Sequence, residues 1–142
     1  MPVPPRITFV TLACRDIERT ADVFRALGWP EAPSSEPVHR VFQLSNGVVL
    51  GLYGADNYER TLGPMGEGFR GFTLAVNLAS PAEVDDAYAT LQGTDGVELL
   101  EAPQDMPWGG RGFSFRDPEG NVWDVVWAEG TTIDERGGLT FP

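Results

Sequence analysis

The chain has 142 residues but no lysine, one cysteine and one histidine. Ten arginines face twenty-one acidic residues, which gives a formal net charge of −11. Nucleic-acid binding needs clustered cations, so this balance argues against it and favours a cationic small molecule as partner. The single Cys14 excludes a disulfide within the chain and fits a small buried hydrophobe in a reducing, cytoplasmic setting.

Long hydrophobic runs are also missing. No apolar segment approaches the roughly twenty residues that a membrane-spanning helix needs, and the N-terminal stretch lacks the charged and apolar regions of a signal peptide. We therefore expect no membrane partner. The length and the hydrophobic content of 42% suit one domain, covering residues 1–142, rather than two independent domains.

The first half of the chain has the pattern of a strand, a helix and a hairpin. Residues 6–15 alternate as a strand does, and Asp16 is a suitable N-cap for the helix that follows. Strand-like residues 40–44 and 48–53 then flank Asn46-Gly47, a typical hairpin turn. These signals predict a strand, a helix and two further strands in this order.

The second half repeats this order. Residues 73–78 are strand-like, Ser80 is a suitable N-cap, residues 97–100 are strand-like again, and residues 111–116 and 121–127 flank the turn residues 117–120. The corresponding caps and turn glycines line up, so two copies of one module are the economical interpretation. We predict an α+β fold in which two tandem βαβββ modules pair their curved sheets around a concave cleft, with the helices on the outer face.

The module boundaries follow from the same pattern. Module 1 covers about residues 6–54 and module 2 about residues 69–128, followed by a tail over 129–142. Residues 55–68 form the linker, which the surrounding glycines and a proline predict to be irregular. The segment from Pro103 to Gly110 is likewise predicted to be a loop.

The last hairpin contains an acidic residue in the middle of a strand. Residues 113–128 read FSFRDPEGNVWDVVWA, and alternation places Asp124 on the face opposite Trp123 and Trp127. Two interpretations stay open. Asp124 either anchors the sheet by accepting hydrogen bonds from backbone or from an arginine, or it contacts a ligand, as a hydrogen-bonding group, a counter-ion or a base.

The segments IERTADVFRALGW and FRDPEGNVWDVVW, together with the repeat, resemble the vicinal oxygen chelate superfamily. This superfamily includes glyoxalase I, extradiol dioxygenases, fosfomycin resistance enzymes and bleomycin-binding proteins. The resemblance covers nearly the whole chain and implies the fold more strongly than a function, because these proteins share an architecture and differ in what the cavity holds. It also implies a homodimer.

In metal-using members, the ligands come from the first and last strand of each module. The corresponding positions here are Phe9, Gly51, Thr73 and Asp124, and only the last carries a side chain that binds metals well. We therefore expect neither the shared metal site nor another cofactor. His39 stands just before a strand, and we expect a surface or hydrogen-bonded role for it rather than metal ligation.

The expected concave face is mostly apolar with a few hydroxyl and amide groups, which is typical of a ligand pocket, although a filled core would use similar residues. The candidate ligand-binding residues are Phe9, Thr11, Gly51, Tyr53, Thr73, Asn77, Trp108, Arg111 and Asp124. Trp108 and Arg111 belong to a loop that serves either as a rim over the site or as a packing plug with an acid-paired arginine.

Three hypotheses about function follow. The first is a metal-free protein that binds an apolar, aromatic or cationic small molecule. The second is a lyase, isomerase or dioxygenase-like enzyme, with an atypical metal set or with Asp124 as a proton-transfer base beside Tyr53 or Thr11. The third is a dimer-forming or regulatory module that uses Trp29 and the apolar tail.

Overall fold

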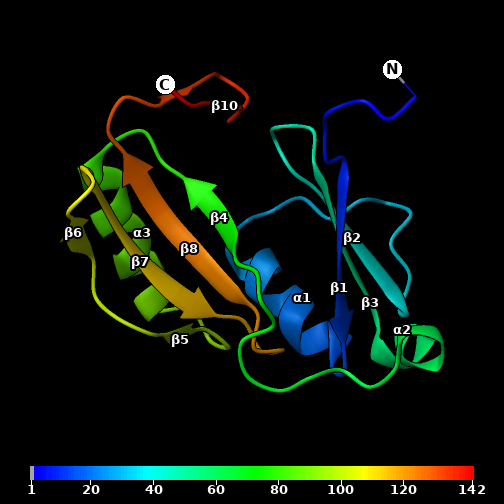
Figure 1. Cartoon of the computed structure of the whole chain (residues 1–142). Coiled ribbons are helices and arrows are strands. Elements are labelled where there is room, and N and C mark those ends of the chain that lie inside the picture. The colour runs from blue at the N-terminus through cyan, green and yellow to red at the C-terminus, as the bar shows by residue number, and fades with distance from the viewer. Residues whose placement is uncertain (1) are drawn as a thin grey trace. The chain divides into compact units, whose positions relative to one another are not determined.

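The computed structural model describes residues 2–142 and divides into two compact units, of which the first ends at Met65 and the second begins at Gly66 (Figure 1). Among these residues, the first unit combines two helices with a sheet and the second combines one helix with β-structure, so the predicted α+β class is confirmed. No helix within residues 2–142 has the length and apolar character needed to cross a bilayer.

The first unit contains a three-stranded sheet and two helices. Its elements are β1 (Phe9–Cys14), α1 (Ile17–Ala26), β2 (His39–Gln43), β3 (Val49–Gly54) and α2 (Ala55–Leu62). The strand order is β1-β3-β2, with β1 parallel and β2 antiparallel to β3.

The second unit repeats this arrangement and adds two short strands to the sheet. Its elements are β4 (Leu74–Asn77), α3 (Pro81–Gln92), β5 (Glu98–Leu99), β6 (Gln104–Met106), β7 (Gly110–Arg116), β8 (Val122–Ala128), β9 (Thr132–Ile133) and β10 (Leu139–Thr140). The sheet order is β4-β8-β7-β5, and β6 pairs with another part of β7. Strands β9 and β10 form a separate small hairpin.

The strand registers show that the two units are copies of one pattern. In the first unit Thr11 of β1 lies opposite Gly51 of β3, and in the second Ala75 of β4 lies opposite Asp124 of β8. Both pairings are parallel. Thr11 and Ala75 each lie five residues before a helix N-cap, and Gly51 and Asp124 each lie four residues after a turn glycine. The correspondence of Gly51 with Asp124 is therefore confirmed by backbone pairing.

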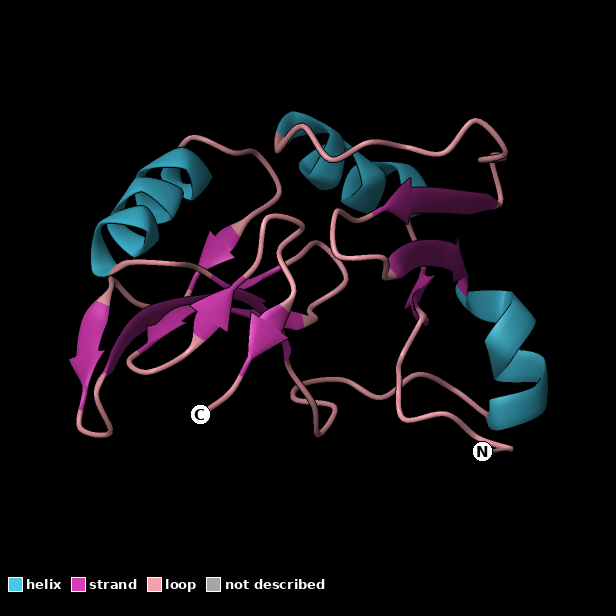
Figure 2. Cartoon of the chain, turned by 90° about the horizontal axis from the view of Figure 1, so that it is seen from above, coloured by secondary structure: helices cyan, strands magenta, loops and turns pink. Residues whose placement is uncertain are grey.

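Both predicted helix caps are present. The Asp16 carboxylate accepts a hydrogen bond from the Arg19 amide at 3.1 Å, and the Ser80 hydroxyl accepts one from the Glu83 amide at 3.2 Å. Each capped helix covers one face of its own sheet (Figure 2). That face holds the core, where Phe24 of α1 packs edge to face against Phe42.

Three features differ from the prediction. Within residues 2–65 the first unit has three strands, so it lacks one strand of the predicted βαβββ module. The segment 55–68 was predicted to be irregular, but α2 forms over Ala55–Leu62, because the glycines stand at its ends rather than inside it. Gly63 ends the helix with a φ of 92°, which favours glycine. The loop predicted from Pro103 to Gly110 contains β6, since the edge of β7 supplies hydrogen-bonding partners that local sequence does not reveal.

Candidate functional site

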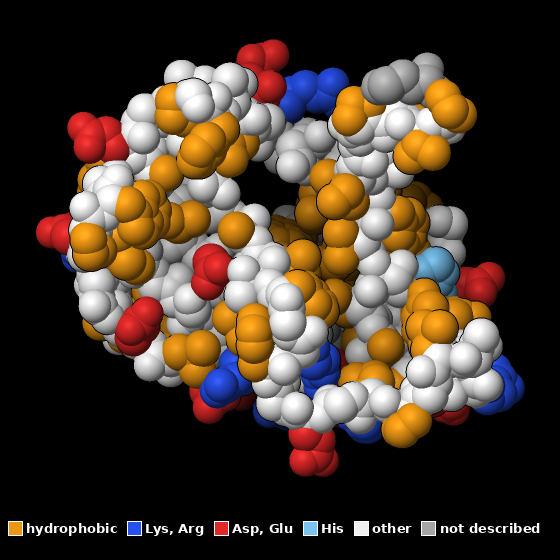
Figure 3. Space-filling view, viewed as in Figure 1, with side chains coloured by type: hydrophobic (Ala, Val, Ile, Leu, Met, Phe, Trp, Pro, Cys, Tyr) orange, Lys and Arg blue, Asp and Glu red, His pale blue; other side chains and the backbone are white. Residues whose placement is uncertain are grey.

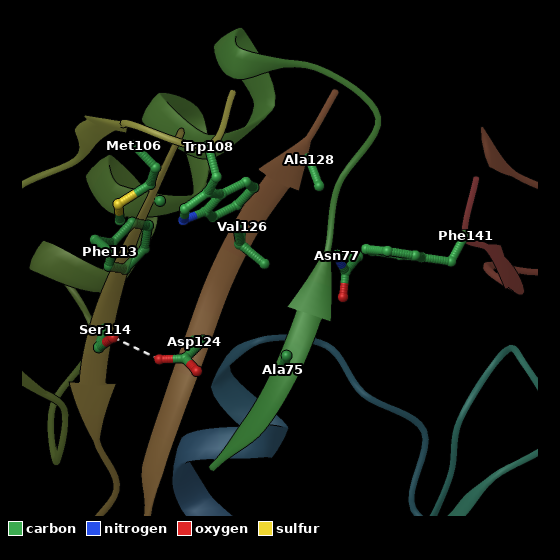
Figure 4. A pocket seen from close by; sticks show the side chains of 11 residues that line it. Ala75, Asn77, Met106, Trp108, Phe113, Ser114, Asp124, Val126, Ala128 and Phe141 are labelled. Carbon is green, nitrogen blue, oxygen red and sulfur yellow. Dashed lines mark hydrogen bonds between the residues drawn. The ribbon is translucent and has the colours of Figure 1, made fainter. Parts of the chain in front are cut away.

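The second unit has a pocket of about 450 Å3 on the sheet face that α3 does not cover (Figure 4). Most of its wall is apolar. The residues that line it are Ala75, Asn77, Met106, Trp108, Gly112, Phe113, Ser114, Asp124, Val126, Ala128 and Phe141. This size and composition are typical of a site for a small organic molecule.

Sheet register places Asp124 in this pocket. It lies in the middle of β8, directly opposite Ser114 of β7 and Ala75 of β4. Residues that are opposite one another in adjacent strands point to the same face, so all three side chains face away from α3. Small neighbours on both sides leave the carboxylate accessible from the pocket, and the close view shows it beside Ser114 (Figure 4).

Two hydroxyl groups hold the Asp124 carboxylate. Ser114 Oγ donates to Oδ1 at 2.6 Å, and Thr73 Oγ1 donates to Oδ2 at 2.8 Å. Among residues 2–142, no arginine or histidine forms an ion pair with Asp124. The negative charge is therefore oriented by neutral donors and is not neutralised by a cation of the second unit.

Arg111 is a predicted ligand-binding residue, but the structure places it outside this pocket. It occurs in β7 one residue from Gly112, so alternation turns its side chain to the helix side. There it contacts Asp85 of α3 and Asp105 of β6, each at 3.0 Å. These hydrogen bonds, first the one with Asp85, raise the pKa of the Arg111 guanidinium. Arg111 thus ties α3 to the edge of the sheet.

Trp108 forms an exposed wall of the pocket. Its side chain is 61% exposed, which excludes the interpretation as a buried packing plug. The indole lies across Gly110, where a Cβ atom would collide with the ring. Gly112 leaves space at the bottom of the pocket. A Cβ atom there would crowd the neighbouring strand, 2.9 Å from the Val125 carbonyl oxygen and 3.2 Å from Val126 Cγ2. Hydrophobic side chains gather over the β6 to β7 turn, at the left of Figure 3.

The C-terminal tail supplies one further wall. Phe141 follows β10, is 74% exposed and extends toward Asn77 of β4 (Figure 4). The turn between β9 and β10 is held by Asp134, whose Oδ1 accepts hydrogen bonds from the amides of Arg136 and Gly138. The tail therefore follows a defined path to the pocket.

The structure brings together only part of the predicted site. Asn77, Trp108 and Asp124 line the pocket, and Thr73 contacts it through Asp124. The other candidates in the first unit, Phe9 and Thr11 on β1 with Gly51 and Tyr53 on β3, occupy that unit's own sheet.

Several lining residues were missed by sequence reasoning. Ser114 had a detectable signal, because counting outward from the turn at residues 117–120 puts it opposite Asp124. Met106 and Phe141 had no such signal, since one follows from pairing of β6 with β7 and the other from the path of the tail.

The four positions that correspond to metal ligands do not fit a catalytic metal. At Gly51, the place of a longer side chain is filled by rings: a Cβ atom there would lie 2.6 Å from Phe9 Cε1 and 3.2 Å from His39 Nε2. The His39 ring packs against Tyr53 with centroids 5.1 Å apart. Three or more histidine, cysteine or acidic side chains suited to hold a metal do not cluster anywhere in residues 2–142.

The family assignment rests on sequence and on fold together. The sequence model of the Glyoxalase/Bleomycin resistance protein/Dioxygenase superfamily matches residues 6–125. The chain belongs to this superfamily. Membership confirms the resemblance that the repeat and the last hairpin indicated, and it leaves the ligand open because superfamily members differ in what they bind.

Solved structures of the superfamily support the same fold. A glyoxalase-related enzyme from Fulvimarina pelagi is 25% identical with a TM-score of 0.84, over 97% of this chain and 99% of that one. A glyoxalase/bleomycin resistance protein/dioxygenase from Nocardioides is 33% identical with a TM-score of 0.72, over 90% and 87% of the two chains.

A lactoylglutathione lyase from Agrobacterium tumefaciens, 19% identical over 87% and 94% with a TM-score of 0.68, shares the fold. No curated protein sequence matches this chain. The homodimer, the cytoplasmic location and the lack of nucleic-acid binding stay predictions.

Proposed function

We propose that this superfamily member binds a small organic cation with a flat, apolar body in the pocket of its second unit. The observation that carries the proposal is the Asp124 carboxylate, which lies in an apolar pocket without a cationic partner from that unit. A charge in such surroundings is costly unless it is paired, so a cationic ligand gains by neutralising it.

The walls and the overall charge support the same ligand class. Trp108 and Phe141 supply exposed aromatic surface for a flat ring, and no lysine, arginine or histidine among the described residues lines the pocket. The net charge of −11 attracts cations and repels anions before contact. A carboxylate or phosphate ligand would meet repulsion without a compensating partner.

Binding is favoured over catalysis because the described residues give the pocket no second group suited to proton transfer. Asp124 is held by the neutral hydroxyls of Thr73 and Ser114, and no lysine, histidine or tyrosine of residues 2–142 lines the pocket beside it. The four positions that correspond to metal ligands do not fit a metal, so they give no support to a metal-dependent enzyme.

Three probes with one shared ring test this function by calorimetry. We expect 2-naphthylmethylammonium to bind more tightly than 2-naphthylmethanol, and 2-naphthylacetate to bind most weakly. Asp124→Asn should lower the affinity of the ammonium probe roughly tenfold to a hundredfold and leave the alcohol almost unchanged. Equal affinity for the three probes, or an unchanged ammonium affinity in the variant, would contradict the proposal.

Asp86→Ala provides the matched control. Asp86 is exposed on α3 and forms no hydrogen bond or ion pair among the described residues. It removes the same unit of charge away from the pocket, so it separates the local contact from the general field of the protein.

A further inference from the structure

The hydrogen bonds around Asp124 leave mainly acceptor atoms facing the pocket. Ser114 and Thr73 each have one hydroxyl proton, and each donates it to the carboxylate. Neither hydroxyl can therefore donate to a ligand while these bonds stand, although each oxygen retains lone pairs. The 2.6 Å distance from Ser114 is typical of a hydroxyl bonded to a charged acceptor.

The carboxylate itself still has accepting capacity. An ionised carboxylate offers about four lone-pair sites, and the two hydroxyls use one on each oxygen. Ser114 Oγ lines the pocket beside Asp124 and adds a third accepting oxygen (Figure 4). This group of oxygens, which we call the acceptor cluster, can receive several hydrogen bonds at once but can donate none.

From this arrangement we infer that the ligand's head group carries several N–H donors, as in a primary ammonium or an amidinium. This inference rests on the proposed function and narrows its ligand class. A group with two or three N–H bonds satisfies the acceptor cluster and neutralises its charge together. A quaternary ammonium carries the same charge without a donor, so it displaces water from these oxygens without replacing its hydrogen bonds.

The aromatic walls make the quaternary ammonium a serious competitor. Trp108 and Phe141 present exposed ring surface to the pocket, and aromatic rings bind quaternary ammonium groups through cation-π attraction. The position of the Asp124 carboxylate decides between the primary and the quaternary ammonium group. The carboxylate lies among accepting oxygens at the strand centre, where N–H donors are needed, whereas Trp108 is 61% exposed at the turn after β6.

The test compares 2-naphthylmethylammonium with its N,N,N-trimethyl derivative, which has the same ring and charge. We expect the primary ammonium to bind at least roughly tenfold more tightly, measured by calorimetry at one pH and ionic strength. Equal affinities, or tighter binding of the trimethyl probe, would overturn the donor requirement and favour aromatic recognition of the charge.

Ser114→Ala tests the acceptor cluster directly. It removes one accepting oxygen and one donor to Asp124, so the preference for the primary over the trimethyl probe should fall severalfold. Ser45→Ala, an exposed turn residue of the first unit, should leave the preference unchanged. A preference that survives in Ser114→Ala would exclude this residue from recognition.

The two proposals fail in different ways. If neither cation binds the wild-type protein, the proposed function is wrong. If both cations bind more tightly than 2-naphthylacetate but equally to each other, the proposed function stands and only the donor requirement is wrong. Unfolding midpoints of each variant show whether a lost preference reflects a lost fold.

Discussion

Removing the Asp117 carboxylate should destabilise the hairpin that positions Asp124. Asp117 is only 4% exposed and lies at the turn between β7 and β8. Its carboxylate accepts hydrogen bonds from the backbone amides of Glu119 and Asn121, from the Asn121 side chain at 3.0 Å and from the Trp123 indole at 3.0 Å. One buried side chain thus organises the turn and the start of β8.

The expected loss is large for a single residue. Hydrogen bonds to a charged group contribute about 1.5–3 kcal/mol each, and bonds that share one acceptor are not additive. Losing those from Asn121 and Trp123 should lower the free energy of unfolding by about 4 kcal/mol in Asp117→Ala. Asp117→Asn keeps one accepting oxygen of the same shape and should lose about 2 kcal/mol.

Urea denaturation followed by far-UV circular dichroism measures both losses. The slope with urea should stay unchanged if only stability is altered. Since a domain has about 5–15 kcal/mol in total, Asp117→Asn keeps the comparison possible if Asp117→Ala does not fold. Asp86→Ala is the control for the removal of charge. If Asp117→Ala were no less stable than Asp86→Ala, the turn would not depend on this carboxylate.

Two further predictions concern other parts of the chain. Thr20 of α1 is fully buried, and its hydroxyl has no hydrogen-bond partner among the described residues. Thr20→Val keeps the shape of the side chain and should raise the free energy of unfolding by about 1 kcal/mol. An unchanged or lower free energy of unfolding in urea denaturation would contradict this prediction. Hydrogen bonds from the Gly138 and Arg136 amides lower the pKa of the Asp134 carboxyl. The stability that Asp134 adds to the tail hairpin is therefore complete above the ordinary aspartate pKa, and it is lost as pH falls through the lower pKa of the folded state. Amide exchange of Gly138, measured by NMR, should accelerate over that acidic range in the wild type and show no such dependence in Asp134→Asn.

Local chemistry made much of the fold predictable. The side chains of Asp16 and Ser80 act within one turn of the chain, so their capping roles can be inferred without any tertiary contact. The repeat was visible for the same reason, because caps and turn glycines recur in matching order. Segment α2 was missed because Gly54 and Gly63 suggested a loop, although both stand at helix ends.

The candidate site was predictable only in part. Strand alternation was enough to separate Asp124 from Trp123, and the same rule, applied to β7, places Arg111 on the side of Phe113 and Phe115 rather than beside Asp124. Thr73 was proposed as a ligand contact, and the structure shows it bonded to the carboxylate. This bond joins residues far apart in sequence, and no local pattern predicts it.

By itself, the sequence determined the α+β class, the two repeats and the isolation of Asp124 from the usual metal ligands, because these follow from short-range periodicity, caps and turns. Only the tertiary structure decided how that carboxylate is held and enclosed. Ser114 and Thr73 reach it through strand register, and Phe141 reaches the pocket through the path of the tail. Such contacts depend on the pairing of distant segments, which local preferences do not specify.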